Sequence, residues 1–183
     1  MDIWLYASDC LQIVVSYQWM LPDYFWGVIY VKIAKLQRGE IKTALELVWT
    51  VFQEFDAPDY SEEGVEEFSR FFSYNDIIDK FDKGELFFWG CFDSGELTGI
   101  IATRGINHII MLYVKKEYHK RGIARSLIRT VEETCRSQNN IDRITVNAAP
   151  YAVEFYHRLG FVDTDKEQTI KGVRFTPMTY LLS

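Results

Sequence analysis

The sequence predicts a mixed α/β fold in one domain. Short apolar runs of strand length alternate with longer segments whose apolar residues recur every three or four positions, as on one face of a helix. At 183 residues the chain is long enough to bury about 70% of its unfolded surface in a single core. No internal repeat and no linker rich in proline, glycine or serine divides the sequence.

The first part of the chain is expected to form one strand followed by helices. Residues 28–36 ("VIYVKIAKL") indicate a strand, and residues 39–55 indicate an amphipathic helix that ends before Pro58. Ser61 suits the N-cap of a second helix with two glutamates in its first turn, and a short third helix is expected over residues 75–83. The apolar face of the second helix consists of Val65, Phe68, Phe71 and Phe72.

A hairpin and a central strand come next. Residues 85–93 and 96–104 are apolar runs joined by the turn Ser94-Gly95, which is typical of a hairpin. Residues 108–114 ("HIIMLYV") are apolar at both alternating positions, which indicates burial on both faces in the centre of the sheet.

Two helices and three strands complete the predicted order. The helix after the central strand repeats an apolar residue every four positions, at Ile123, Leu127, Val131 and Cys135. The remaining elements are strands over residues 142–147, 161–165 and 173–183 and a helix over residues 149–159 that Gly160 ends.

Composition excludes some functions and favours a compartment. The net charge of -6 argues against a nucleic-acid partner held by bulk electrostatics and weakly favours cationic substrates. The three cysteines, Cys10, Cys91 and Cys135, are odd in number, widely separated and in apolar surroundings. We therefore expect reduced thiols and a cytoplasmic protein.

Residues 1–27 form an aromatic-rich segment that the regular pattern does not include. Its longest uncharged run lies between Asp9 and Asp23, which is too short to span a bilayer, and it lacks the features of a signal peptide. We expect no membrane association. We interpret residues 1–27 as an N-terminal extension of unassigned origin and residues 28–183 as the domain, with the hypothesis that the physiological start lies near Val28.

The stretch "HKRGIARSLI" (residues 119–128) predicts an anion site. A helix start exposes backbone N–H groups without intrahelical partners and carries about half a positive charge. Gly122 places no side chain there, and Lys120 and Arg121 add charge. From the residues alone, a turn glycine before a solvated basic helix is an equal alternative. The chain contains neither a P-loop nor a dinucleotide-binding glycine motif in the required context.

Taken together with "ITVNAAPYAVEFYHRLGF", this region resembles the acyl-coenzyme A binding core of the GNAT superfamily of N-acetyltransferases. The family's pyrophosphate loop follows the pattern [QR]-x-x-G-x-[GA]. Gly122 and Ala124 fit this pattern, whereas His119 stands at the position where the family has glutamine or arginine. The resemblance implies a mostly antiparallel central sheet with splayed central strands, flanked by helices. It also implies acetyl-CoA as co-substrate and, as acceptor, an amine of a small molecule or of a peptide or protein terminus.

The resemblance also implies roles for individual residues. The pantetheine arm would lie along the backbone of Leu112, Tyr113 and Val114. The pyrophosphate loop would consist of His119, Lys120, Arg121, Gly122, Ile123, Ala124 and Arg125. Asn147 would meet the pantetheine or the acceptor, although a helix cap is nearly as good an interpretation. Tyr156 would lie near the thioester sulfur, whereas the pattern alone favours a core aromatic residue.

The implied chemistry is direct transfer of an acetyl group to an amine without a covalent enzyme intermediate. The amide of Leu112 is the candidate donor to the oxyanion, and Tyr156 is the candidate general acid. The sequence identifies no base. His108 could act through water, but a hydrogen-bonded structural histidine is the favoured interpretation. The histidines and cysteines are too scattered for a metal site, so none is expected.

Two rival functions are consistent with the sequence. A non-catalytic acyl-CoA binding or regulatory module would keep the anion site without a competent acceptor site. A purely structural domain would use the aromatic segment of residues 1–27 as an interface, which predicts a homodimer that dissociates when this segment is removed.

Overall fold

The computed structural model describes residues 31–138 and 140–182. The strands are β1 (Val31–Lys35), β2 (Leu86–Asp93), β3 (Glu96–Arg104), β4 (His108–Val114), β5 (Arg143–Ala148), β6 (Val162–Asp163), β7 (Gln168–Ile170) and β8 (Val173–Leu181). The helices are α1 (Ile41–Phe55), α2 (Glu62–Phe71), α3 (Tyr74–Asp82), α4 (Ile123–Arg136) and α5 (Val153–Arg158). The predicted extension, residues 1–27, lies outside the described residues.

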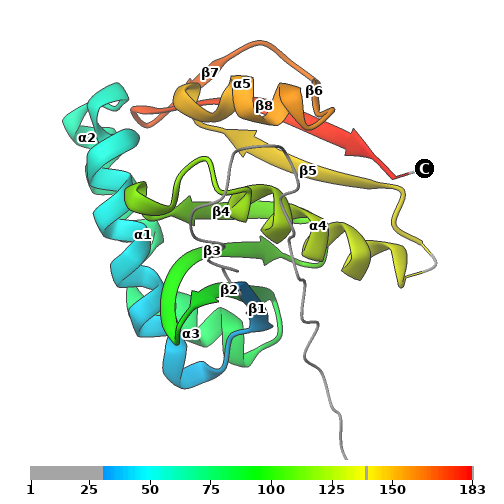
Figure 1. Ribbon diagram of the computed structural model, residues 1–183. Helices are drawn as coiled ribbons and strands as arrows, with labels where there is room; N and C mark the ends of the chain where they lie inside the picture. The colour runs from blue at the N-terminus through cyan, green and yellow to red at the C-terminus, as the bar shows by residue number, and fades with distance from the viewer. Residues whose placement is uncertain (1–30, 139, 183) are drawn as a thin grey trace, which may run out of the picture.

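The strands form one sheet in the order β1-β2-β3-β4-β5-β8-β6, with β7 paired to β8. Every pairing is antiparallel except that of β4 with β5, which is parallel. This parallel pairing is short: it consists of His108 with Thr145 and Ile109 with Val146. Figure 1 shows β5 turning away from β4 towards the C-terminal ends of the two strands. The predicted splayed sheet is therefore confirmed.

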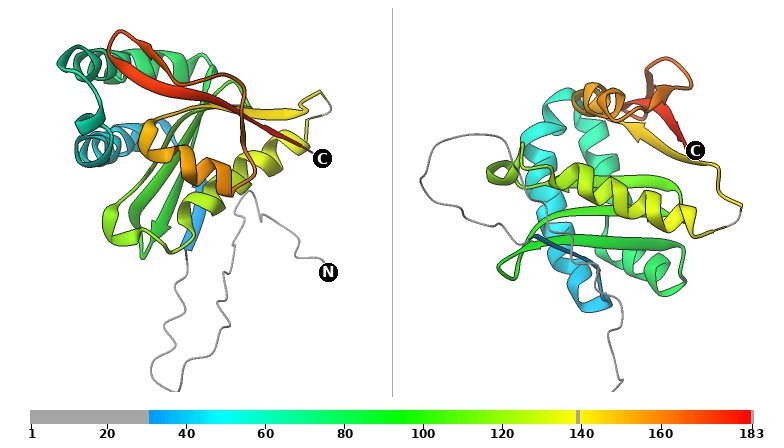
Figure 2. Two further views of the ribbon diagram at one scale, coloured as in Figure 1. Left: turned by 90° about the horizontal axis from the view of Figure 1, so that it is seen from above. Right: turned by 45° about the vertical axis from the view of Figure 1, so that its right-hand side comes forward.

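Helices cover both faces of the sheet, as the two views of Figure 2 show. Helices α4 and α5 cover one face, where Leu127 and Val131 pack with Ile144 in a continuous apolar cluster. Helices α1, α2 and α3 cover the other face, where Phe52 and Ile77 are fully buried. Each fully buried side chain of this size contributes about 1.5–3 kcal/mol, so the two clusters fix the position of the strands between them.

The predicted order of elements is confirmed, and the differences occur near the chain's end and in α2. Strand β7 was not predicted, and the strand expected over residues 161–165 is reduced to β6. Phe68 is buried and stacks on Phe52 with ring centroids 3.6 Å apart. Phe71, the last residue of α2, is 41% exposed, so the apolar face predicted for this helix is only partly buried. Within the described part of the chain, no helix is long and apolar enough to cross a membrane.

Candidate active site

The gap between β4 and β5 exposes backbone groups of β4. The N–H of Lys115 donates to the carbonyl oxygen of Thr98 on β3 (2.9 Å). Antiparallel ladders alternate bonded and non-bonded pairs, so the backbone of Tyr113 also faces β3. The backbone groups of Leu112 and Val114 consequently face the β5 side, beyond the last β4–β5 pair. These are the positions where the resemblance expects the pantetheine arm and the oxyanion donor.

The loop before α4 has the geometry of an anion site. Gly122 is the N-cap of α4 in the left-handed conformation, with φ 80°, and no side chain caps the helix. The N–H groups of the first turn are therefore open to a ligand. Lys120 is also left-handed, with φ 61°, which is uncommon for a residue other than glycine. Position 122 favours glycine because its φ is positive, and the missing side chain also leaves room for an anion to approach the helix, as the sequence indicates.

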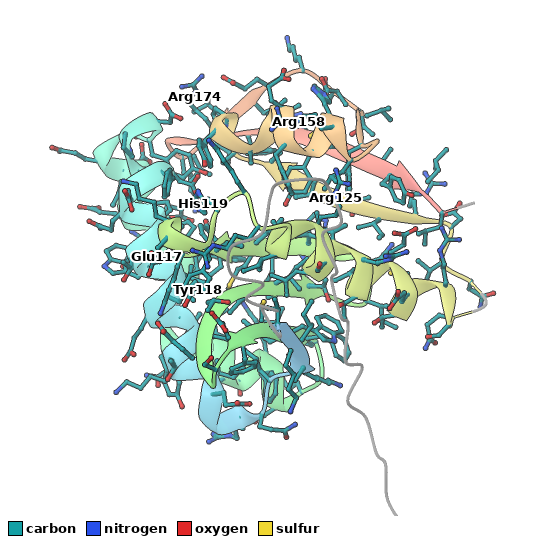
Figure 3. The ribbon with its side chains drawn as sticks, in the orientation of Figure 1. Glu117, Tyr118, His119, Arg125, Arg158 and Arg174 are labelled. Atoms are coloured by element: carbon teal, nitrogen blue, oxygen red, sulfur yellow. The ribbon has the colours of Figure 1, made fainter. Side chains whose placement is uncertain are left out.

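The basic side chains around this loop divide into paired and unpaired groups. Lys115 pairs with Glu96 and Lys116 with Glu54. The Arg121 guanidinium lies over the ring of Tyr118 at 4.8 Å from its centroid. Lys120 and Arg125 have no acidic partner among the described residues, and Figure 3 shows Arg125 on α4. Lys120 and Arg125 therefore carry positive charge that no acidic side chain of the described residues offsets.

His119 joins the loop to the central strand. Its Nε2 lies 2.8 Å from the carbonyl oxygen of Val114, so the ring donates from Nε2. Its ring packs against Phe55 at the end of α1, with centroids 5.1 Å apart. Figure 3 shows His119 beside the loop that leads into α4. His119 thus positions the loop, a role that motif matching did not indicate because the contact depends on the fold.

Tyr156 of α5 packs in the buried cluster that also contains Val114 of β4 and Ala148 of β5. Its ring is 3% exposed and meets Phe155 and Phe161 edge to face. Its hydroxyl has no hydrogen-bond partner among the described residues, although every fully buried side-chain nitrogen or oxygen there has one. The hydroxyl therefore keeps contact with accessible space. Burial, and secondly the negative charge of Asp56, raise the pKa of Tyr156, so the phenol is protonated at neutral pH and can act as a proton donor.

Asn147 is an exposed residue within β5, opposite Pro177 of β8. The N-cap of the short helical turn Pro150–Ala152 is Ala149, and no side chain caps it. The cap interpretation of Asn147 is therefore wrong, since Asn147 lies two residues before the cap position. A role for Asn147 towards a ligand stays a prediction.

Sequence reasoning missed Asp56, which follows the last residue of α1. Its side chain is buried, and its Oδ2 accepts a hydrogen bond from the Tyr113 hydroxyl (2.8 Å). Burial raises the pKa of Asp56 to about 6, the Tyr113 hydrogen bond opposes this increase, and nearby Asp59 adds to it. No motif marks this residue, and only its burial distinguishes it from the other carboxylates.

His108 has the structural role that the sequence favoured. It lies at the end of β4 that does pair with β5, and its Nδ1 is 2.8 Å from the hydroxyl of Thr145. Burial, and secondly the charge of Arg104, lower the pKa of His108. The described residues contain no group of three or more His, Cys, Asp or Glu side chains that could hold a metal ion.

A splayed pair of parallel strands with an open helix start beside it is the arrangement that the resemblance implies for an acyltransferase. The family model for an acetyltransferase (GNAT) domain matches residues 56–182. The chain therefore belongs to the GNAT acetyltransferases. A comparison with curated proteins gives no match.

Solved structures show the same fold. A GCN5-related N-acetyltransferase from Rhodopseudomonas palustris is 24% identical, with 82% of this chain and 94% of that chain covered and a TM-score of 0.70. The PaiA N-acetyltransferase from Thermoplasma acidophilum, in complex with coenzyme A, is 23% identical over 82% and 98% of the two chains, with a TM-score of 0.66. A spermidine N-acetyltransferase chimera of Vibrio cholerae and hSSAT is 19% identical over 83% and 95%, with a TM-score of 0.60.

Proposed function

We propose that the protein transfers the acetyl group of acetyl-CoA to an amine by direct attack in a ternary complex. The single observation that carries this proposal is the set of groups around the β4–β5 gap. The Leu112 N–H faces the gap, the Tyr156 hydroxyl has no hydrogen-bond partner among the described residues, and Gly122 leaves the start of α4 open. The coenzyme A complex of the Thermoplasma protein, which has the same fold, supports acetyl-CoA as the donor.

The groups would act in sequence on the thioester. The N–H groups of α4 and the charges of Lys120 and Arg125 would hold the pyrophosphate, and the β4 backbone would hold the pantetheine arm. The Leu112 N–H would stabilise the tetrahedral oxyanion, which is worth about 3 kcal/mol for one preorganised donor. Tyr156 would protonate the leaving thiolate. We also propose that residues 28–183 form the functional unit.

Two measurements test the proposal. At an acetyl-CoA concentration 100 times its dissociation constant, binding adds about 2.7 kcal/mol to the free energy of unfolding. For a domain of this size, this raises the unfolding midpoint by roughly 5–10 °C. Release of free CoA must then depend on an added amine. Binding without amine-dependent release would favour the non-catalytic acyl-CoA module, and no midpoint shift with any CoA species would favour a structural role.

A further inference from the structure

We propose that Asp56 binds the positively charged amino group of the acceptor and takes its proton, and that the acceptor is a small primary amine that arrives as a cation. This inference rests on the proposed function, because it assigns the missing base and the substrate class to the same site. It goes beyond the family match, which identifies neither.

Asp56 is a buried carboxylate that has no cationic partner among the residues the structure describes. Its backbone N–H donates to the carbonyl oxygen of Phe52 (2.9 Å), so α1 fixes its position, and the residue is only 7% exposed. Within the described residues it forms no ion pair, and its one side-chain hydrogen bond comes from Tyr113. An ionised carboxylate buried without a positive partner is costly. The ammonium group of a bound amine would supply the missing charge.

Among the described residues, the titratable groups whose charges interact with Asp56 come from three further elements and include no cation. Tyr113 comes from β4, Asp59 from the short helix Ala57–Asp59, Tyr60 from the residue after it, and Tyr156 from α5. The charge of Asp56 contributes to a raised pKa at each of the three tyrosines, so all three phenols stay neutral at pH 7. The Tyr113 hydroxyl contacts the carboxylate, and a phenol ring attracts an ammonium group through cation–π contact in addition to the charge of Asp56.

The position of Asp56 suits proton transfer at the reaction centre. Tyr113, which binds Asp56, directly follows Leu112, the candidate oxyanion donor. The side chains of these two neighbours point to opposite faces of the sheet, Tyr113 towards the α1 side and Leu112 towards the α4 side. Asp56, bound to Tyr113, therefore lies on the α1 side of the sheet, and Tyr156 lies in the cluster on the side of α4 and α5, so the two groups would act on an acceptor from opposite sides.

The proton and bond changes balance with these groups. The Asp56 carboxylate takes one proton from the ammonium and becomes a carboxylic acid. The neutral nitrogen forms a C–N bond to the thioester carbon, and the C–S bond breaks. Tyr156 gives its proton to the thiolate and regains one from the new amide nitrogen, which carries an excess proton after attack. Asp56 then releases its proton to water, so the products are the acetamide, free CoA and one proton.

The first experiment compares the pH dependence of kcat/KM in the full-length wild type and two variants, Asp56→Asn and Asp76→Asn. Asp76 is an exposed carboxylate on α3 and serves as the matched control. The acceptors are ethylamine, diaminobutane and benzylamine with saturating acetyl-CoA. We expect the wild type and Asp76→Asn to lose activity below pH 6 as Asp56 is protonated. Asp56→Asn should be about 10² to 10⁴ times slower and lack this acid limb.

The second experiment uses an acceptor that needs no base. Trifluoroethylamine is a weakly basic amine that is mostly neutral at pH 7.5. For this acceptor, Asp56→Asn should lose less than about tenfold in kcat/KM, against the loss of about 10² or more expected with the best ordinary amine. A residue that only supports the fold would impair both acceptors equally.

The outcomes separate the two proposals. If no amine releases CoA from the wild type, the proposed function fails and this inference fails with it. If the wild type is active but Asp56→Asn keeps its activity and its acid limb, only the inference is overturned. An equal loss with both acceptors also overturns it. Acetyl-CoA should raise the unfolding midpoint of Asp56→Asn as much as that of the wild type, which shows that the variant is folded and binds the donor.

Discussion

The Nε2 of His119 lies 2.8 Å from the carbonyl oxygen of Val114, so the side chain that replaces the family's glutamine or arginine connects the anion loop to the central strand. We expect His119→Ala to weaken acetyl-CoA binding by about 3- to 10-fold, because one net hydrogen bond is worth about 0.5–1.5 kcal/mol. His119→Gln retains a donor and should lose less. Calorimetric titration gives both affinities. His157→Ala is the control, since His157 is paired with Asp163 on the surface, and an equal effect there would refute the positioning role.

Replacing Tyr156 by Phe tests the proposed acid. The hydroxyl has no partner in the described chain, so its removal leaves the packing around the ring intact. We expect turnover to fall by about 10² to 10⁴ with little change in acetyl-CoA affinity. Steady-state kinetics and titration on the same preparation separate the two effects. Tyr180→Phe removes a hydroxyl that contacts Glu132 and should leave turnover unchanged. Full activity of Tyr156→Phe would rule Tyr156 out as the acid.

Asp56→Asn should increase stability while it decreases activity. The folded state binds the Asp56 proton more tightly than the unfolded chain does, because the pKa rises from 3.8 to about 6. Stability is therefore lost as the pH rises from about 4 to about 6, and at pH 7.5 this loss is about 3 kcal/mol at most. The asparagine variant lacks this loss. Denaturant unfolding should show the variant to be more stable at pH 7.5 and similar to wild type at pH 4, and a less stable variant at pH 7.5 would contradict the assignment.

Gly172 tests how α2 meets the turn between β7 and β8. A Cβ at Gly172 would lie 2.1 Å from the Oγ of Ser61, the N-cap of α2, and 2.6 Å from the Gly64 nitrogen. Gly84 has a similar φ, 70° against 75°, but open space around it. Gly84→Ala therefore measures the backbone strain alone, about 1–2 kcal/mol. Gly172→Ala should cost more in thermal unfolding, and equal losses would show that the contact yields without cost.

The periodic patterns predicted the elements well because burial decides them. The four-residue repeat from Ile123 to Cys135 lies on the buried face of α4, and the doubly apolar run of residues 108–114 is the central strand β4. The turn at Ser94-Gly95 was also predictable, because a two-residue connection that contains glycine is typical of a tight hairpin. Both residues have the positive φ that such a turn requires. Strand β7 has only Gln168–Ile170, which is too short for an alternating pattern to be recognised.

The site was only partly predictable, because several of its contacts join distant parts of the chain. The anion loop is contiguous and could be read from "HKRGIARSLI". Asp56 and Tyr113 are 57 residues apart, and nothing local distinguishes Asp56 from Asp59, which is exposed. The same applies to Phe55, which packs against both His119 and Tyr151. These groups meet only when α1 is placed against β4 and the turn after β5.

The shortness of the β4–β5 pairing has a mechanical consequence. Two residue pairs, His108 with Thr145 and Ile109 with Val146, are the whole backbone ladder between the half of the sheet built from β1 to β4 and the half built from β5 to β8. A ligand lying along β4 would occupy the position where β4 and β5 share no backbone pairs, so it would bridge the two halves of the sheet where they are least connected. Amide hydrogen exchange in β5 should then slow when acetyl-CoA is present, while exchange in β2 stays unchanged.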